Sequence, residues 1–348
     1  MRITIVGAGA MGSLIAARLS QASAASATPD AITSTAPITS QDDRITQGIT
    51  RVLLYGRPSA HLDAISSHGL ALTELDGGTH TIPIETSSDP IDVAGSDVVI
   101  VLVKSWASAE AVAPLRPFLT RDSVVLTLQN GIGNAAMLRT ALLDKGVRPH
   151  VWLGVTTQAA LRTSPGHLIH SGDGITAIGR RNATANASIQ TLAAHLTGAG
   201  WRTVAVDDIH RWVWRKLAVN CAINPLTALG GVSNAAIREN PALAAAAAQI
   251  AAEVVAVAKA ENVNIELAEV TAAIDEVARN TGTNRSSMLV DLEHGMRTEI
   301  DAINGAVLAS GRRLKIETPL NDLMVALVRA REKQVVEPSR EHLASHAI

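Results

Sequence analysis

Apolar residues follow two different patterns along the chain, and the pattern changes near residue 207. Before that point, short continuous apolar runs alternate with longer segments of helical periodicity. Such runs are typical of strands that helices cover on both faces. The runs that we predict to be strands are 2–6, 51–55, 97–103, 123–128, 151–156, 167–170, 175–178 and 202–206.

From Asp207 onward strand signals nearly vanish and helical periodicity continues. The pattern predicts helices over 209–227, 241–262, 267–280, 286–312 and 319–336. Alternating strands and helices followed by helices alone predict a Rossmann-like α/β domain with a mainly parallel sheet, then an all-α domain. We place these domains at 1–206 and 207–348, and the length of 348 residues also suggests about two domains.

Residues 20–50 interrupt the alternation. They are rich in Ser, Thr, Ala and Pro and show little periodicity, and the segment is too long for an ordinary helix-to-strand connection. We predict a flexible surface insertion there. Ligands of such sheets bind at the carboxyl ends of the strands, so we expect the insertion to lie away from the chemistry and residues 24–46 to be dispensable for turnover.

A glycine-rich segment follows the first predicted strand and opens the first predicted helix; it comprises Gly7, Ala8, Gly9, Ala10, Met11 and Gly12. The first glycine of such a turn allows a sharp bend, the second lets the backbone approach a pyrophosphate, and the third lets helix and strand pack closely. The helix N-terminus offers unpaired N–H groups to phosphates. We predict a dinucleotide site here, with a purely structural turn as the alternative.

The end of the second predicted strand indicates which dinucleotide is preferred. NAD sites usually carry an acid there to bind the ribose 2′-hydroxyl, but this strand is followed by Gly56 and Arg57, with no acid before Asp63. The planar guanidinium of Arg57 can pair with a 2′-phosphate. The sequence therefore favours NADPH and NADP⁺ over the NAD forms, with a solvated turn arginine as the alternative.

Two further strand ends carry polar side chains. Lys104 follows the third predicted main strand and Asn130 the fourth. Carboxyl ends of parallel strands meet at one edge of a sheet, where cofactor and substrate bind. A solvated lysine and an ordinary Asn-Gly turn are equally open interpretations at these positions.

A polar stripe on an apolar helix is the most informative feature of the second domain. Lys216, Asn220 and Asn224 are spaced four residues apart, so they share one face of the helix predicted over 209–227. Their neighbours are apolar, and buried polar side chains are costly unless they are paired. The pattern predicts a stripe that faces a ligand, with a satisfied seam between helices as the alternative. A buried lysine of this kind can deliver a proton to a ketone undergoing reduction.

The composition of the chain excludes several classes of binding partner. The formal net charge is −2 and aromatic residues make up 2% of the chain, which argues against nucleic acid and against a polybasic membrane anchor. The single cysteine, Cys221, and the absence of a signal-peptide pattern lead us to expect a cytoplasmic protein. The eleven histidines show no metal-ligand spacing, so we predict no metal site and disfavour a metal-dependent enzyme.

Several longer motifs resemble the ketopantoate reductase (2-dehydropantoate 2-reductase) family. They are WRKLAVNCAINPLTAL (214–229), SSMLVDLEHGMRTEIDAINGAV (286–307), VLVKSW (101–106) and QNGIG (129–133). The resemblance covers nearly the whole chain outside 20–50. It implies NADPH-dependent reduction of ketopantoate to (R)-pantoate, on the route to pantothenate and coenzyme A.

The resemblance also implies roles for individual residues. Lys216 is similar to the family's general acid, and Glu299 to the acid that contacts the cofactor and orients the lysine. The positions similar to substrate contacts are Asn220, Asn224, Asn234, Asn284 and Ser287, of which Asn234 follows a divergent segment and Ser287 can also be read as a helix cap. The positions similar to cofactor contacts are Arg57, Lys104, Asn130 and the backbone of Ala160.

The expected mechanism places the nicotinamide at a cleft between the two domains, with the oxo acid between the ring and the Lys216 helix. Two alternatives stay open. The first is an NADPH-dependent reductase of another branched 2-oxo acid, and the second is a non-catalytic NADP(H)-sensing protein. Apart from this small-molecule substrate we expect no partner, and a monomer or a homodimer.

Overall fold

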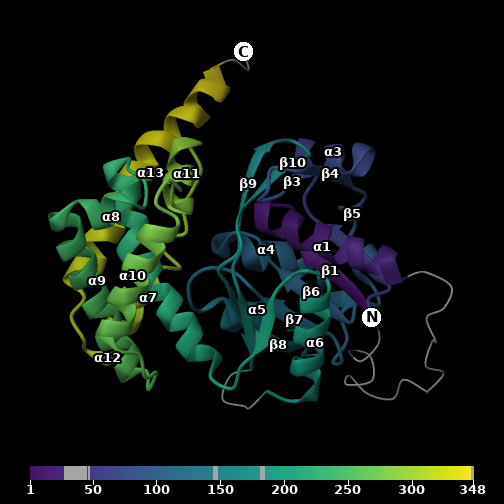
Figure 1. The fold of residues 1–348 in the computed structure, drawn as a ribbon, viewed down its shortest axis with the longest axis horizontal. Helices are drawn as coiled ribbons and strands as arrows, with labels where there is room; N and C mark the ends of the chain where they lie inside the picture. Colours follow the sequence, from purple (N-terminus) through teal and green to yellow (C-terminus); the bar gives the residue numbers. More distant parts are fainter. Residues whose placement is uncertain (27–44, 46–47, 144–147, 181–184, 346–348) are drawn as a thin grey trace. The chain divides into compact units, whose positions relative to one another are not determined.

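The computed structural model describes residues 1–26, 45, 48–143, 148–180 and 185–345, the last ten of them as backbone only. Contacts divide the chain into two compact units, and Figure 1 shows their elements. The first unit comprises 1–129 and 134–209. The second comprises 130–133 and the chain from His210 onward. The main division falls close to the change of pattern at 207, whereas no local pattern indicates that 130–133 groups with the later residues.

An eight-stranded sheet organises the first unit. Every neighbouring pair is parallel except β8 and β11, which are antiparallel. This confirms the expected α/β class with a mainly parallel sheet. In spatial order the strands are β12 (Thr203–Ala205), β11 (Thr176–Gly179), β8 (His150–Thr156), β7 (Val124–Thr127), β6 (Val98–Val101), β1 (Arg2–Val6), β2 (Arg51–Tyr55) and β5 (Glu85–Ser87).

The central strands are buried on both faces, which explains their continuous apolar runs. Along β1, Ile3 and Ile5 pack into one core cluster, while Val6 packs into a second. The same alternation divides Val98 and Val99 of β6 between the two clusters. The helices of this unit are α1 (Ala10–Ser26), α3 (Ala60–His68), η1 (Pro90–Val93), η2 (Ser105–Ala107), α4 (Ser108–Val112), η3 (Ala113–Phe118), α5 (Asn134–Ala141) and α6 (Ala187–Gly198).

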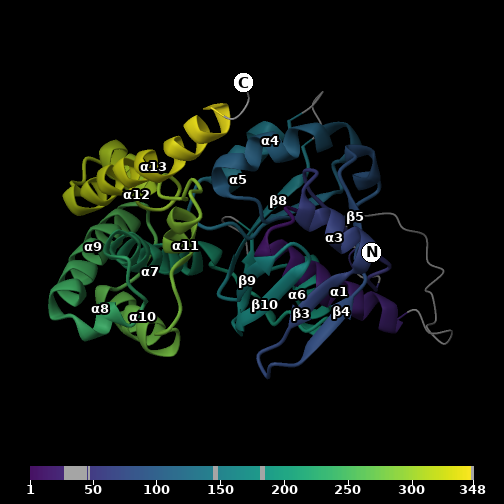
Figure 2. The ribbon, with the colours of Figure 1, turned by 90° about the horizontal axis from the view of Figure 1, so that it is seen from above.

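A second, four-stranded sheet is largely absent from the sequence-based prediction. Its order is β4 (Thr79–Ile82), β3 (Leu70–Thr73), β10 (His167–Gly172) and β9 (Ala159–Ser164), and Figure 2 shows these strands grouped together. Only β10 was predicted. Strands β4 and β9 are mostly exposed, and β3 has only four residues, so none of the three carries a long apolar run that would reveal it.

The histidine His61 connects three parts of the first unit. Its Nδ1 accepts a hydrogen bond of 2.9 Å from the Gly166 backbone N–H, at the turn between β9 and β10. Its Nε2 lies 3.0 Å from the Ser13 hydroxyl on α1. The side chain is buried, and this burial, with a smaller contribution from Arg162, lowers the pKa of His61 from 6.5 to about 4.

This neutral imidazole makes stability depend on pH. Below about pH 6.5 the imidazole of the unfolded chain is protonated, whereas that of the folded chain stays neutral until about pH 4. The stability present above pH 6.5 is therefore lost as the pH falls from 6.5 to about 4. We expect His61 to account for about 2 kcal/mol of lost unfolding free energy between pH 7 and pH 5. Urea unfolding of His61→Gln should show a correspondingly smaller loss of unfolding free energy between pH 7 and pH 5. The control is His68→Gln, at an exposed position of the same helix, which should lose as much as the wild type. An unchanged loss in His61→Gln would contradict the assignment.

The segment 20–50 differs in part from its prediction. Residues 20–26 continue helix α1, because their alanines favour a helix even without an apolar stripe. Ile45 is buried in the core of the first unit, and the Met1 amino group donates to the Gly48 carbonyl. The buried Ile45 contradicts the expectation of a surface insertion at this position, and deletion of 24–46 would remove this core side chain. That turnover survives the deletion stays a prediction. Residues 27–44 and 46–47 lie outside the described residues.

Helices form the second unit, as predicted, and pack around one apolar cluster. They are α7 (Ile209–Gly230), α8 (Ala236–Glu239), α9 (Pro241–Ala260), α10 (Leu267–Asn280), α11 (Ser287–Glu293), α12 (Asn304–Leu314) and α13 (Pro319–Ser345). Among the described residues, α9 alone is long and apolar enough to cross a membrane. Seven of its side chains, mostly Ala and Val, are buried in the core of the second unit.

The helix predicted over 286–312 is two helices. The chain leaves α11 after Glu293, passes Gly295 with a φ of 62°, and re-enters a helix at Asn304. A positive φ is open to glycine and ends a helix at that point. The intervening loop, residues 294–303, carries Glu299, so the break determines where this carboxylate lies.

Candidate active site

The glycine-rich turn has the shape that a dinucleotide requires. A Cβ on Gly12 would lie 1.9 Å from the Gly7 carbonyl oxygen, so only glycine lets α1 approach the end of β1 so closely. A Cβ on Gly9 would meet no atom within 4 Å. The backbone of Gly9 is therefore open on its outer side, at the N-terminus of α1, where a pyrophosphate would bind. Ala8, Ala10 and Met11 complete the turn and pack against the core.

Arg57 lies just beyond β2, after Gly56. Its guanidinium is 3.9 Å from the Glu110 carboxylate, and both side chains are more than 70% exposed. An ion pair that is so exposed contributes little and is readily exchanged. Arg57 is thus available to a phosphate at the end of the second strand.

The ends of β6 and β7 are joined by a side chain that the sequence does not single out. The Gln129 amide donates to the Val103 carbonyl at 2.8 Å and to the Ser108 hydroxyl at 2.6 Å. Lys104 follows Val103 directly, at the start of η2. The structure therefore places half-buried Lys104 at the carboxyl edge of the sheet, as expected from its position after a parallel strand.

Ala160 lies in the second sheet. It pairs with His170 in the antiparallel ladder between β9 and β10, and its side chain packs against the core. Strand β9 also contacts α1, the helix that the glycine-rich turn opens.

Lys216, Asn220 and Asn224 all lie on α7, as predicted. Lys216 and Asn220 are half-buried, and Asn224 is buried. Within the described residues the side-chain amides of Asn220 and Asn224 make no hydrogen bond, whereas the Asn224 carbonyl accepts one from Thr227. A satisfied seam between helices would pair these two amides with other side chains, so their lack of such partners favours a ligand-facing stripe.

The most informative geometry is a chain of three side chains within the second unit. The Lys216 ammonium donates to the Asn130 Oδ1 at 2.8 Å. The Asn130 Nδ2 donates in turn to the Glu299 Oε2 at 3.0 Å. Asn130 therefore connects the lysine to the carboxylate, a place that the sequence does not predict for it. Glu299 is buried, rather than the surface charge that a lone glutamate usually is.

Two opposing effects act on the lysine. Burial lowers the pKa of Lys216 from 10.5 to about 8, while the negative charge of Glu299 acts to raise it. A lysine with a pKa near neutrality can hold a proton and release it within one reaction cycle. The carboxylate therefore opposes the effect of burial and favours the charged ammonium form of the lysine.

Asn130 and Glu299 are brought together by backbone contacts. The Ile132 N–H donates to the Ala302 carbonyl at 3.1 Å, which joins the segment 130–133 to the loop that carries Glu299. That loop is fastened to α13: Glu332 accepts hydrogen bonds from the Thr298 N–H and hydroxyl at 2.7 and 2.6 Å. These fastening contacts join residues far apart in the sequence, so no local motif could reveal them.

The remaining predicted substrate residues lie near one another at the end of α7. The Asn234 N–H donates to the Asn284 carbonyl at 3.0 Å. The Asn234 Nδ2 donates to the Thr281 hydroxyl, while its buried Oδ1 has no partner. Asn234 therefore offers an unused acceptor, despite the divergent segment that precedes it.

Ser287 is exposed in the first turn of α11 and does not cap that helix. Its neighbour Ser286 is the cap, accepting from the Leu289 N–H at 3.2 Å. Ser286 also lies 2.8 Å from the Thr227 hydroxyl on α7. This contact fixes the start of α11 close to the Asn224 end of the stripe and leaves the Ser287 hydroxyl available.

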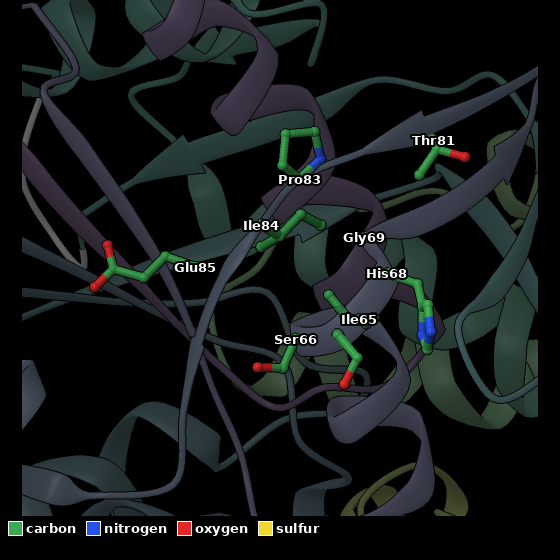
Figure 3. A pocket seen from close by; sticks show the side chains of 9 residues that line it. Ile65, Ser66, His68, Gly69, Thr81, Pro83, Ile84 and Glu85 are labelled. Carbon is green, nitrogen blue, oxygen red and sulfur yellow. The ribbon is translucent and has the colours of Figure 1, made fainter.

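A surface pocket lies elsewhere in the first unit, between the end of α3 and the segment that joins β4 to β5 (Figure 3). Ser66, His68, Thr81 and Glu85 are among the residues that line it. None of the predicted site residues lines this pocket, so it offers no support for the chemistry described above.

Comparisons with known proteins show which family this chain resembles. Residues 43–183 match the family described as "Ketopantoate reductase PanE/ApbA", and residues 208–332 match "Ketopantoate reductase PanE/ApbA C terminal". The 2-dehydropantoate 2-reductase of Halobacterium salinarum is 37% identical over 82% of this chain and 92% of its own length. That of Pyrococcus horikoshii is 32% identical over 95% and 98%, respectively.

Solved structures show the same similarity. A ketopantoate reductase from Ralstonia eutropha matches with a TM-score of 0.79 and 31% identity, over 96% of this chain and 99% of that one. A D-mandelate dehydrogenase, solved with NADH and anilino(oxo)acetate, matches with a TM-score of 0.82 and 25% identity, over 96% and 99%. The chain therefore belongs to the ketopantoate reductase (PanE/ApbA) family of oxidoreductases.

Proposed function

We propose that this protein reduces ketopantoate to (R)-pantoate with NADPH, and that Lys216 is the proton donor. The observation that carries the proposal is the chain from Lys216 through Asn130 to buried Glu299. Its lysine lies on α7, the helix that also carries Asn220 and Asn224. Curated relatives named 2-dehydropantoate 2-reductase match 82% and 95% of the chain.

The described residues fit a nicotinamide dinucleotide. The open backbone at Gly9 and the close packing at Gly12 form the phosphate turn, and Lys104 lies at the carboxyl edge of the same sheet. When bound, the reduced nicotinamide supplies a hydride to the keto carbon of the substrate. The chain itself supplies the proton and the groups that orient the oxo acid.

Lys216 acts on the keto oxygen. Its ammonium first stabilises the negative charge that develops there and then transfers its proton to it. Asn130 accepts a hydrogen bond from the same nitrogen, which aims the remaining N–H groups. Glu299 orients Asn130 and supports the positive charge on Lys216, so its role combines electrostatics with positioning.

The substrate contacts follow the polar stripe. Asn220 and Asn224 bind the hydroxyl and carbonyl oxygens of the oxo acid, and Ser287 donates to its carboxylate. Asn234 and Asn284 close the far end of the site. A site built to hydrogen-bond a substrate hydroxyl rejects analogues that lack one, because its own amides are then left unpaired.

The cofactor preference follows from Arg57. We expect Arg57→Ala to raise the KM for NADPH at least about tenfold, the effect of losing a charge-assisted contact with the 2′-phosphate. The KM for NADH should change much less. Arg121→Ala, which removes an exposed arginine before β7, is the control for net charge. Equal effects on both cofactors would contradict the assignment.

One experiment tests the function as a whole: oxidation of NADPH and of NADH by the purified protein, with ketopantoate and a panel of other 2-oxo acids. Ketopantoate with NADPH should give the highest kcat/KM. The likeness to a D-mandelate dehydrogenase makes reduction of the aromatic oxo acid of mandelate the second candidate. Cofactor binding without turnover of any oxo acid would indicate a sensor. The cytoplasmic location and the monomeric or dimeric state stay predictions.

A further inference from the structure

Helix α7 contains a proline in the middle of the polar stripe. Pro225 follows Asn224 directly and lies inside the helix. Proline has no backbone N–H, so the carbonyl four residues earlier, that of Cys221, loses its intrahelical hydrogen bond. This carbonyl lies between Asn220 and Asn224, and the loss leaves the helix free to bend at that point.

A side chain from another helix donates the hydrogen bond that the Cys221 carbonyl lacks within α7. The Asn304 Nδ2, at the start of α12, donates to the Cys221 carbonyl at 3.1 Å and to the Asn321 Oδ1 at 3.0 Å. Both partners are acceptors, so only the amide nitrogen of Asn304 can bond them. This fixes which way the side-chain amide is oriented. Its Oδ1 is buried without a partner. Asn304 therefore serves as a donor, although one acceptor is left unpaired.

The support for Asn304 is itself anchored. Asn304 and Asn321 are fully buried. The Asn321 Nδ2 donates to the Glu253 carboxylate of α9 at 2.7 Å, and the same carboxylate accepts the Leu320 and Asn321 N–H groups at 2.8 and 2.9 Å. A carboxylate that accepts N–H groups in the first turn of α13 is favourably placed. The Cys221 carbonyl, which lacks its hydrogen bond within α7, is thus connected through Asn304 and Asn321 to helices α13 and α9.

We propose that Asn304 is a positioning residue: it supplies the hydrogen bond that Pro225 removes from α7 and so holds Asn224 in line with Asn220 and Lys216. Its connection to catalysis rests on the proposed function. The existence of the hydrogen bond does not depend on the proposed function, so an experiment can refute either one without the other.

The single cysteine of the chain allows a direct measurement. Protein labelled with carbonyl-¹³C cysteine carries the label at Cys221 alone, and its infrared band and ¹³C resonance report the hydrogen bond of that carbonyl. Asn304→Ala should move the band to higher frequency, as expected for a carbonyl that loses a donor. Asn264→Ala, at an exposed position between α9 and α10, should leave it in place. An unmoved band in folded Asn304→Ala would overturn the proposal.

A double-mutant cycle then tests the link to Pro225. Asn304→Ala should lower kcat/KM about 10–100-fold, mainly through the KM for the oxo acid, because the misplaced amide lies on the substrate side. Pro225→Ala restores an N–H to the helix. In that background Asn304→Ala should cost no more than about threefold.

Two results would overturn the proposal in this cycle. One is an equal loss from Asn304→Ala in both backgrounds, and the other is a loss confined to the KM for the cofactor. If Pro225→Ala does not fold, the infrared band of the labelled Cys221 carbonyl in Asn304→Ala still tests the proposal. Wild-type protein that lacks oxo-acid reductase activity would refute the proposed function and leave the hydrogen-bond measurement intact.

Discussion

Lys216→Ala is expected to lower kcat for ketopantoate reduction by about 10²–10⁴-fold, the usual contribution of a positioned general acid. The variant loses the proton donor and the positive charge opposite the developing oxyanion. Binding of NADPH, measured by fluorescence titration, should be retained, because the phosphate turn lies in the first unit. Lys259→Ala removes an exposed lysine of the second unit that pairs with Glu266, and it should behave like the wild type.

The same lysine should determine the alkaline limb of the pH profile. The ammonium is the active form, and its pKa is about 8. As the pH rises through that value the proton is lost, so kcat/KM should fall tenfold per pH unit above it. Lys216→Arg keeps a charge throughout this range; its residual activity should show no such limb. A Lys216→Ala variant within a few-fold of wild type, or an unchanged limb in Lys216→Arg, would remove the lysine from the mechanism.

Gly131→Ala is expected to lower kcat by about 10²-fold. A Cβ at this position would lie 2.1 Å from the Ala302 carbonyl oxygen, which is backbone and cannot move cheaply. The segment 130–133 must then shift away from the loop that carries Glu299, and Asn130 moves with it. A displacement of about 1 Å in such a group is enough for a loss of this size.

Gly133→Ala provides a matched control. Gly131 and Gly133 both have a positive φ, of 83° and 92°, so an alanine is strained at either position. Only Gly131 faces a neighbour; a Cβ on Gly133 would meet nothing within 4 Å. The difference in kcat between the two variants therefore isolates the docking of Asn130. Equal losses would attribute the effect to backbone strain alone.

The strands of the main sheet illustrate what can be read locally. Strands β1 and β2 agree with the predicted ranges, because residues buried on both faces must all be apolar. The second sheet was largely missed because β4 and β9 are mostly exposed. Pairing with neighbouring strands, rather than an apolar pattern of their own, makes them strands. The predicted helix over 286–312 failed for the opposite reason: its periodicity continues across Gly295, where the backbone turns.

The site divides in the same way. The stripe of Lys216, Asn220 and Asn224 follows from helical spacing, since three residues four apart must share a face. The bridging place of Asn130 could not be predicted, because its partners are 86 and 169 residues away in the sequence. The same is true of Asn304, whose acceptor is 83 residues away.

The amino-acid sequence alone determined the two-part architecture, the glycine-rich turn and the helix face that carries the lysine, because each depends on spacing within a few residues. The tertiary structure decided what surrounds that lysine: which carboxylate supports its charge, which amide aims it, and which side chain replaces the hydrogen bond missing at Pro225. These choices bring together groups from distant parts of the chain. Their distances and burial set the pKa of Lys216 and the alignment of the stripe, and neither quantity is encoded in any short stretch of residues.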